Sequence, residues 1–379
     1  MTHKQRALAA MRGRPVDHVP FIARMELWYN YNRNAGTLPA RFRHATLWEL
    51  QRELDVGIFG FGVWEASYFR LEYRGVELET EHEDGITTTR YVTPYGTLAS
   101  RDRMADELKE AAGTGARVEY PFRGAQDFDA LQYLFDHAVV VDDAEAYCRF
   151  VDSIGEDGIA LPFTGTLPAH QLMLSWMGYE GFYYAMADHP ARVERLIGAL
   201  TERQREILAL ARRCPADAIE VGANYDEHIT PPPVFASLFA PFYREARATL
   251  EAAGKILVIH GDGDMDGLLP MLRDCGIQVV EALTPAPMTG IRMRRVRQEW
   301  EGAVTLWGGL ASVALTRAFT EEEFEAYLED LFDAVAPGDR FILGFGDNVP
   351  TDALFHRVEK TVDFWKRRGR YPLRKGRTT

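Results

Sequence analysis

Residues 255–276, KILVIHGDGDMDGLLPMLRDCG, hold one complete unit of the expected fold. The unit begins with an apolar run that ends at His260, continues through a loop rich in glycine and aspartate, and returns as an apolar helical pattern. An apolar run without strict alternation is typical of a strand that is buried on both faces, as in a parallel sheet. The stretch therefore predicts a strand, a loop and a helix, in that order.

The same stretch also matches the opening of a calcium-binding EF-hand loop. Asp262, Asp264 and Asp266 stand at alternate positions and a glycine follows them, as in D-x-D-x-D-G. That loop needs a bidentate glutamate at its twelfth position, which here is Arg273, a cation. We therefore reject calcium and expect His260 and Asp262 at the end of a buried strand.

The strand-and-helix unit recurs along the chain. Apolar strand-like runs occupy residues 19–24, 56–62, 158–165, 217–224, 255–263, 277–283, 303–309 and 340–348. Helical patterns stand between these runs, and eight such units favour an α/β fold of the (β/α)8 TIM barrel type over an open sheet. We expect residues 1–379 to form a single barrel domain.

One segment, about residues 71–143, interrupts this rhythm after the second barrel strand. Over residues 71–102, β-branched and polar residues alternate around the turn signals EDG and PYG, which predicts an inserted antiparallel hairpin or meander. Residues 104–143 are expected to add extra helices.

Bulk properties exclude several classes of protein. The net charge of −13 argues against a nucleic-acid surface, which needs a cationic face. No apolar run approaches the ~20 residues of a membrane span, and the N-terminus lacks a signal peptide, so we expect a cytoplasmic protein with no membrane contact. Cys148, Cys214 and Cys275 form no pair with metal-ligand spacing, and they indicate neither disulfides nor a thiolate zinc site.

In barrels of this type the active site lies at the carboxyl ends of the strands. Glu220, His260, Asp262 and Glu281 stand there as candidate catalytic residues. Candidate substrate-binding residues at the same ends or in the following loops are Arg24, Glu26, Trp28, Trp64, His170, Asn224, Asp226, Trp307 and Asp347, and Asn348 follows the last of them. Polar, ionisable and aromatic side chains are thus expected to converge on one face.

Each candidate also has a structural interpretation. His260 could be a core histidine with its hydrogen bonds satisfied, and Asp226 could only hold a turn or begin a helix. Glu220 and Glu281 are harder to dismiss, because each lies in an apolar run and a buried carboxylate is costly unless it is paired or used. Arg24 could be their counter-ion, or it could hold an anionic substrate.

Several segments resemble the uroporphyrinogen decarboxylase superfamily. They are RGRPVDHVPF at 12–21, LPFTG at 161–165, the long block at 224–287, LWGG at 306–309 and RFILGFGDNVPTDALFHRVEKTVDFW at 340–365. The resemblance implies a (β/α)8 barrel, and the superfamily includes both the decarboxylase and cobamide-dependent methyltransferases. It also implies a homodimer.

Departures from the family motifs bear on the function. The decarboxylase has R-Q-A-G-R-Y after its first strand to bind the carboxylates of the porphyrinogen, whereas this chain has ARMELWYNYNR, with Arg24 near the first arginine. The coenzyme M methyltransferases bind zinc through H-x-C and a later cysteine, whereas this chain has His260 with Asp262, and GFGDN with no cysteine. A thiolate zinc site is therefore not expected, and a metal would be held by His260 with Glu281 or Asp347.

The chain is closer in pattern to the O-demethylase-type methyltransferases, which pass a methyl group from a methoxylated aromatic or another methyl donor to a corrinoid on a separate protein. The aromatic segments MELWYNYN and FGVWEASYF suit a flat small-molecule substrate, and the corrinoid motif D-x-H-x-x-G is absent, so a partner protein would carry the corrinoid. His260, Glu220 or Glu281 would act as general acid, oriented by Asn224 and Asp262. The alternatives are a decarboxylase or lyase of a carboxylated substrate, and a non-catalytic barrel that binds a small ligand.

Overall fold

Eight parallel strands form the centre of the molecule, in a computed structural model that describes residues 1–61, 67–104 and 115–375. One sheet contains β1 (Ile22–Ala23), β2 (Gly57–Phe61) and β9 (Gly158–Leu161). The other contains β10 (Ala218–Glu220), β11 (Ile256–His260), β12 (Val279–Leu283), β13 (Thr305–Leu310) and β14 (Phe341–Phe345). Each of the eight predicted runs contains one of these strands.

Parallel bridges join the two sheets at both of their edges. Phe21 pairs with Leu343, which links the segment before β1 to β14. Phe163 pairs with Glu220, which links the end of β9 to β10. This arrangement is consistent with the predicted barrel, in which every strand has a neighbour on each side.

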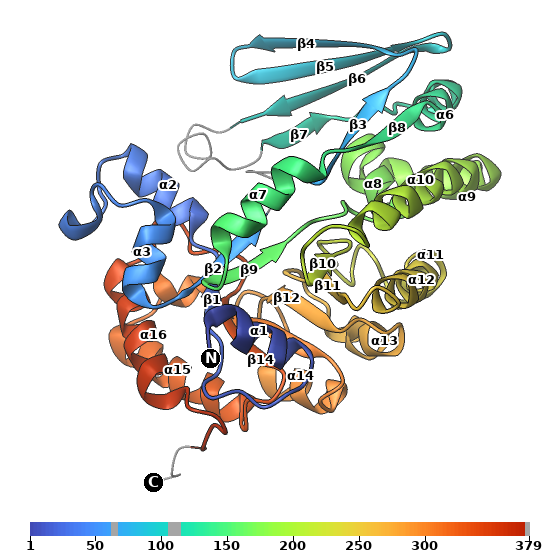
Figure 1. Ribbon diagram of the computed structural model, residues 1–379. Coiled ribbons are helices and arrows are strands. Elements are labelled where there is room, and N and C mark those ends of the chain that lie inside the picture. The colour runs from blue at the N-terminus through green and yellow to red at the C-terminus, as the bar shows by residue number, and fades with distance from the viewer. Residues whose placement is uncertain (62–66, 105–114, 376–379) are drawn as a thin grey trace.

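Helices cover the outside of the strands (Figure 1). Along the first half of the chain they are α1 (His3–Met11), α2 (Glu26–Asn34), α3 (Leu47–Leu54), α6 (Phe128–Asp136), α7 (Ala144–Ile154), α8 (Pro168–Gln171) and α9 (Gly178–Asp188). Then follow α10 (Pro190–Ala211), α11 (Pro232–Leu238), α12 (Ala240–Glu251), α13 (Leu269–Asp274), α14 (Met293–Trp300), α15 (Glu321–Val335) and α16 (Phe355–Arg368). Shorter helical turns are η1 (Ala40–Phe42), η2 (Ala125–Asp127), η3 (Leu172–Trp176), η4 (Asp266–Leu268) and η5 (Ser312–Leu315).

Apolar side chains fill the interior between the strands. Phe59 and Trp307 meet edge to face there, with ring centroids 5.3 Å apart. Helix α1 packs on this cluster through Ala7, Ala10 and Met11, and the Thr305 hydroxyl, at the start of β13, donates to the carbonyl of Ala10. The amino ends of the strands are therefore closed by a helix, which leaves the carboxyl ends for a site.

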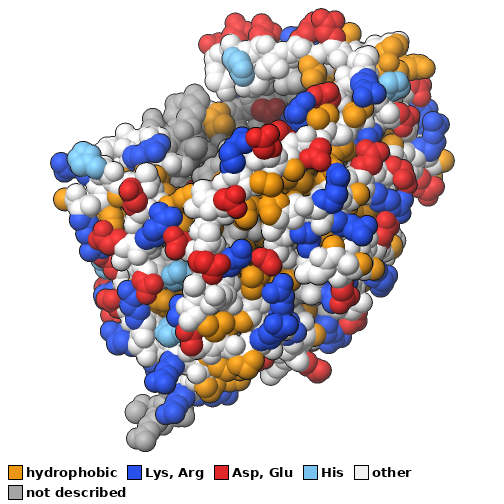
Figure 2. Space-filling model, viewed as in Figure 1, with side chains coloured by type: hydrophobic (Ala, Val, Ile, Leu, Met, Phe, Trp, Pro, Cys, Tyr) orange, Lys and Arg blue, Asp and Glu red, His pale blue; other side chains and the backbone are white. Residues whose placement is uncertain are grey.

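The predicted antiparallel insertion is present. Strands β4 (Glu77–Glu83), β5 (Ile86–Thr93), β6 (Gly96–Arg103) and β7 (Ala116–Glu119) form an antiparallel sheet at the top of Figure 1. Strand β4 is exposed along its length and places four glutamates on one face, which contribute to the acidic row at the top of Figure 2. Charge on an exposed edge strand opposes edge-to-edge aggregation.

The prediction for residues 104–143 needs a correction. Besides α6, this segment contains β7 and a further strand, β8 (Ala138–Asp142), which pairs with β3 (Phe69–Tyr73) in antiparallel orientation. The run Val139–Val141 explains the strand, because β-branched side chains fit a pleated sheet better than a helix. No helix in the described part of the chain is long and apolar enough to cross a bilayer.

Candidate active site

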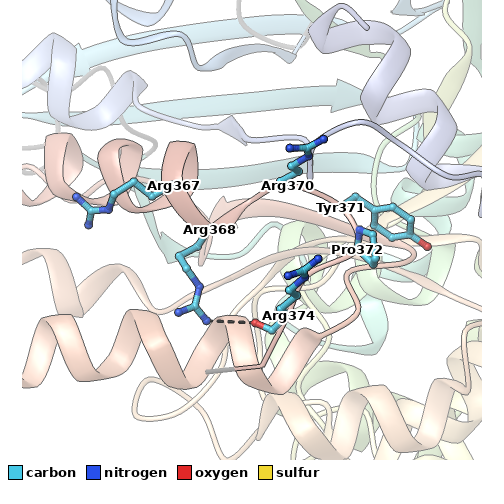
Figure 3. Close-up of a pocket in the computed structure, with 6 residues that line it drawn as sticks. All are labelled: Arg367, Arg368, Arg370, Tyr371, Pro372 and Arg374. Atoms are coloured by element: carbon cyan, nitrogen blue, oxygen red, sulfur yellow. Dashed lines mark hydrogen bonds between the residues drawn. The ribbon is translucent and has the colours of Figure 1, made fainter. Parts of the chain in front are cut away.

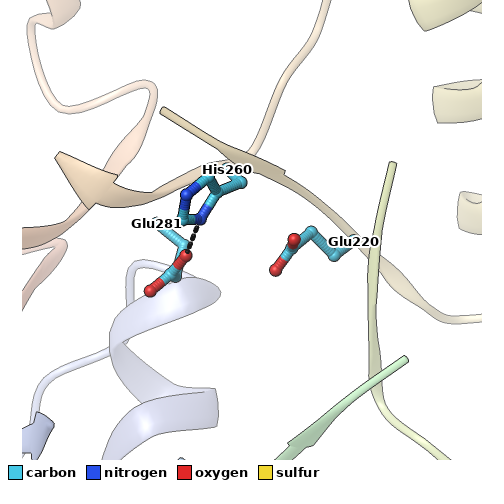
Figure 4. Close-up of side chains that lie close together, drawn as sticks. All are labelled: Glu220, His260 and Glu281. Carbon is cyan, nitrogen blue, oxygen red and sulfur yellow. Dashed lines mark hydrogen bonds and ion pairs between the residues drawn. The ribbon is translucent and has the colours of Figure 1, made fainter. Parts of the chain in front are cut away.

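Three neighbouring strands bring Glu220, His260 and Glu281 together at their carboxyl ends (Figure 4). His260 and Glu281 are partners in the parallel register of β11 and β12, and His260 Nδ1 lies 2.7 Å from Glu281 Oε2. The Glu220 carboxylate points toward this pair, and ligand atoms of the three side chains all lie within 4.8 Å of one another. The three strand-end residues predicted to be catalytic are thus adjacent.

Burial decides the charge of these groups. Glu220 is only 1% exposed, and its Oε2 has no hydrogen-bond partner. Burial raises the pKa of Glu220 to about 8, and the neighbouring Glu281 carboxylate contributes to the rise. Burial by itself would lower the pKa of His260, but Glu281 and Asp262 outweigh it and raise that pKa well above its ordinary value. At neutral pH the site therefore holds a protonated carboxylic acid beside a histidinium–carboxylate pair.

Two further carboxylates face the other nitrogen of His260. Asp262 Oδ2 lies 3.5 Å from His260 Nε2, and Asp347 Oδ1 lies 3.6 Å from the same atom. Both aspartates are more exposed than the buried trio, so this edge of the cluster faces outward. Burial opposes ionisation of Asp262, but the His260 ring lowers the pKa of this carboxyl below its usual range.

Asn224 holds Asp262 in place. Its Nδ2 lies 3.2 and 3.3 Å from the two carboxylate oxygens of Asp262. Asn224 and Asp347 both have a left-handed backbone, with φ of 60° and 62°, a conformation that Asn and Asp tolerate better than most residues. The residue types at these two strand ends thus suit the backbone as well as the site.

Among the described residues, Arg24 is the arginine that contacts this cluster. Its Nη1 donates to Asp347 Oδ1 at 2.6 Å, and its guanidinium lies over the rings of Phe59 and Phe61, 5.3 and 5.2 Å from their centroids. Burial would lower the pKa of Arg24, but Asp347 and Glu281 more than offset this effect, so the side chain stays charged. Its Nε is buried without a hydrogen-bond partner.

Glu26 extends the cluster on the side of Arg24. Asn348 Nδ2 donates to Glu26 Oε2 at 3.2 Å, and burial raises the pKa of this glutamate. Asn348 had no predicted role, Phe61 was predicted only as part of the aromatic segment FGVWEASYF, and Phe59 was not predicted. The alternation in β2, where every second residue faces the same way, is the signal that could have found the two phenylalanines.

Four residues that the sequence predicted to bind substrate do not lie in the cluster around His260. Trp28 is buried, stacks on Phe355 with centroids 4.9 Å apart and donates to the Ala353 carbonyl. Trp307 is buried in the apolar cluster between the strands and donates to the Ile22 carbonyl. Both tryptophans therefore serve the core, because an aromatic ring that can also satisfy its N–H is a stable core residue.

His170 and Asp226 are the other two. The ring nitrogens of His170 face the Ala223 carbonyl at 3.1 Å and the Thr230 hydroxyl at 2.9 Å, and burial lowers its pKa to about 4. Asp226 accepts from the backbone N–H of His228 and so holds a turn. Trp64, also predicted to bind substrate, lies outside the described residues.

Two overlapping groups of side chains could hold a metal ion. One is Glu220, His260 and Glu281, and the other is His260, Asp262 and Asp347. Both offer only nitrogen and oxygen donors, and none of the three cysteines belongs to either group. These donors suit a hard or borderline divalent cation and do not provide a thiolate zinc site.

A separate hollow of about 560 Å³ lies beside the C-terminal segment (Figure 3). Its lining residues are Arg367, Arg368, Arg370, Tyr371, Pro372 and Arg374. Arg370 is bridged to His18, which precedes β1, so this hollow lies toward the amino ends of the strands. It therefore does not share a face with the cluster at the carboxyl ends.

Comparisons with known proteins agree with this arrangement. A structure described as a methyltransferase from Methanosarcina mazei matches with a TM-score of 0.57 and 14% identity, over 97% of this chain and 99% of that one, which shows a shared fold. The sequence matches none of the curated proteins with which it was compared. The family model of uroporphyrinogen decarboxylase (URO-D) matches residues 92–368, more than half of the chain. The chain belongs to the uroporphyrinogen decarboxylase family.

Proposed function

We propose that the protein is a methyltransferase that takes a methyl group from a small methoxylated aromatic donor and passes it to a corrinoid carried by a partner protein. The observation that carries this proposal is the buried carboxyl group of Glu220, with its Oε2 unpartnered, beside the His260–Glu281 pair. Burial raises the pKa of this group and so favours its protonated form. An aryl methyl ether that loses its methyl group leaves a phenoxide, and a phenoxide leaves more readily when it receives a proton. The similarity in fold to a methyltransferase is compatible with this proposal.

The proposed step uses the chain's own residues for proton transfer. The bond between the methyl carbon and the ether oxygen breaks, the methyl group goes to the cobalt of the acceptor, which supplies the electron pair, and the proton of Glu220 goes to the leaving oxygen. The resulting Glu220 carboxylate is stabilised by the positive charges of His260 and Arg24, both of which lower its pKa. Glu281 keeps His260 charged and oriented, and Asn224 orients Asp262.

A bound metal would change this scheme. If a divalent cation binds, Glu220, His260 and Glu281 would hold it, and it would supply a positive charge next to the leaving oxygen.

Decarboxylation is the second candidate, because the family model is that of a decarboxylase. A protonated Glu220 could also deliver a proton to the carbanion that decarboxylation leaves behind. The charge of the site disfavours a porphyrinogen with eight acid groups, since Arg24 is the arginine in the cluster and Asp347 already pairs with it. Methyl transfer therefore fits the geometry better.

The test mixes the purified protein with chemically reduced cob(I)alamin and a panel of methoxylated aromatics, and follows methylcob(III)alamin by its visible spectrum. Formation that depends on the protein and is lost in Glu220→Gln supports the proposal. Persistent Co(I) with every donor, together with release of carbon dioxide from a carboxylated substrate, would support decarboxylation instead.

A further inference from the structure

Acidic groups outnumber basic groups at the carboxyl ends of the strands. The carboxyl groups in or beside the cluster are Glu26, Glu220, Asp262, Glu281 and Asp347. The cations that act on them from the described residues are Arg24 and His260. Even with Glu220 and Glu26 both protonated, three carboxylates face two cations. A site with an excess of negative charge disfavours an anionic ligand.

Arg24 is already paired with a carboxylate, so the carboxylate of a ligand would have to compete for it. Its Nη1 donates a hydrogen bond to Asp347 Oδ1 at 2.6 Å, and the faces of Phe59 and Phe61 lie against its guanidinium. The same Asp347 carboxylate lies 3.6 Å from His260 Nε2. One carboxylate thus stands between the two cations and occupies the place where the carboxylate of a ligand would bind.

An uncharged aromatic surface adjoins these groups. Phe61 is the last residue of β2, and Phe163 stands just after β9. Both are half-buried, and their ring centroids are 5.8 Å apart. Phe163 is bridged to Glu220, which places this surface next to the acid. A flat apolar ring can stack there without any counter-ion.

We propose that Asp347 is a specificity-determining residue that makes the site select uncharged aryl methyl ethers over carboxylated ones. The inference rests on the proposed methyl transfer, since it names the class of donor. A carboxylated donor must either remain unpaired beside Asp262 and Asp347 or displace Asp347 from Arg24. An uncharged ether has to do neither.

The test compares para-methoxybenzyl alcohol with para-methoxybenzoate, which have similar size and the same methyl ether but differ in charge. Isothermal titration calorimetry on the full chain should give the alcohol a Kd at least about ten-fold lower than that of the benzoate. Asp347→Asn removes the negative charge that competes for Arg24, and it should reduce this ratio to near one or reverse it. Asparagine suits the variant because it tolerates the φ of 62° at this position.

Two further variants control the result. Asp274→Asn removes an exposed carboxylate that pairs with Arg273 on the surface, and it should leave the ratio unchanged. Arg24→Met in the Asp347→Asn background should abolish the gain in benzoate affinity, because the gain is assigned to the released guanidinium.

The inference is overturned if the wild-type protein prefers the benzoate, if Asp347→Asn leaves the ratio unchanged, or if neither compound binds. Methyl transfer to cob(I)alamin, followed with the same two donors, separates the two proposals. A preference for the alcohol without any methyl transfer would contradict the proposed function and keep the charge selection. Methyl transfer that prefers the benzoate would support the proposed function and contradict the charge selection.

Discussion

Replacing Glu220 by glutamine removes the buried acid and keeps its shape. Glu220 has a pKa of about 8 in the folded chain and 4.5 when it is exposed. Between these two pH values the unfolded chain ionises this group while the folded chain does not, so ionisation favours the unfolded chain. The folded protein therefore loses stability between pH 4.5 and pH 8. The loss is about 1 kcal/mol at pH 5 and about 5 kcal/mol at pH 9.

Glu220→Gln should therefore be more stable than the wild-type protein by a margin that grows with pH, while losing methyl transfer. Urea denaturation at pH 5 and pH 9 measures the margin. Glu79→Gln, on the exposed strand β4, is the matched control and should change neither stability nor activity. An equal margin at both pH values would refute the assignment of a buried, protonated acid.

The remaining predictions follow from the same contacts. Methyl transfer should decline above about pH 8, as Glu220 loses its proton, and a rate that stays constant to pH 10 would exclude it as the acid. His260→Ala should lower turnover by roughly 10²-fold, because it removes the positive charge that stabilises the Glu220 carboxylate after proton transfer. Full turnover in this variant would remove His260 from the mechanism. His170, with a pKa of about 4 in the fold, should cost the protein about 3 kcal/mol of stability as the pH falls from 6.5 to 4, and His170→Asn should lack this loss in urea titrations. Trp28→Phe should leave KM for the donor unchanged and lower the free energy of unfolding by roughly 1 kcal/mol through the lost hydrogen bond to Ala353.

The sequence was sufficient to predict the eight parallel strands. Runs such as 255–263 and 340–348 are apolar at successive positions, and only a strand buried on both faces tolerates that pattern together with a polar end. The segment around β8 was mistaken for a helix because only Val139–Val141 carry the β signal, between acidic and helical stretches. Its pairing with β3 is a long-range contact that periodicity does not reveal.

The acidic residues of the site were predictable and the aromatic ones were not. Glu220 and Glu281 stand out because a carboxylate in an apolar strand needs a partner, and the parallel register supplies one for Glu281. A tryptophan gives no such signal, since it is favourable in a core and at a binding surface alike. Whether Trp307 points into the interior or toward the mouth depends on its height along β13, which the sequence does not state.

The acid and the charge selection have one physical cause. Glu220 keeps its proton because it is buried and because Glu281 and Asp347 are negative neighbours, and those carboxylates also make the site unfavourable for an anionic donor. An enzyme of this family whose substrate carries several carboxylates would need unpaired cations at the carboxyl ends of the strands to bind them. Such cations would lower the pKa of Glu220. A strong demand for anion binding and a proton held at neutral pH therefore oppose each other at this position. Asp347→Asn removes a negative neighbour of Glu220 and leaves the positive charge of Arg24 uncompensated. Both changes stabilise the Glu220 carboxylate and lower its pKa, so the decline of methyl transfer should move to lower pH in this variant.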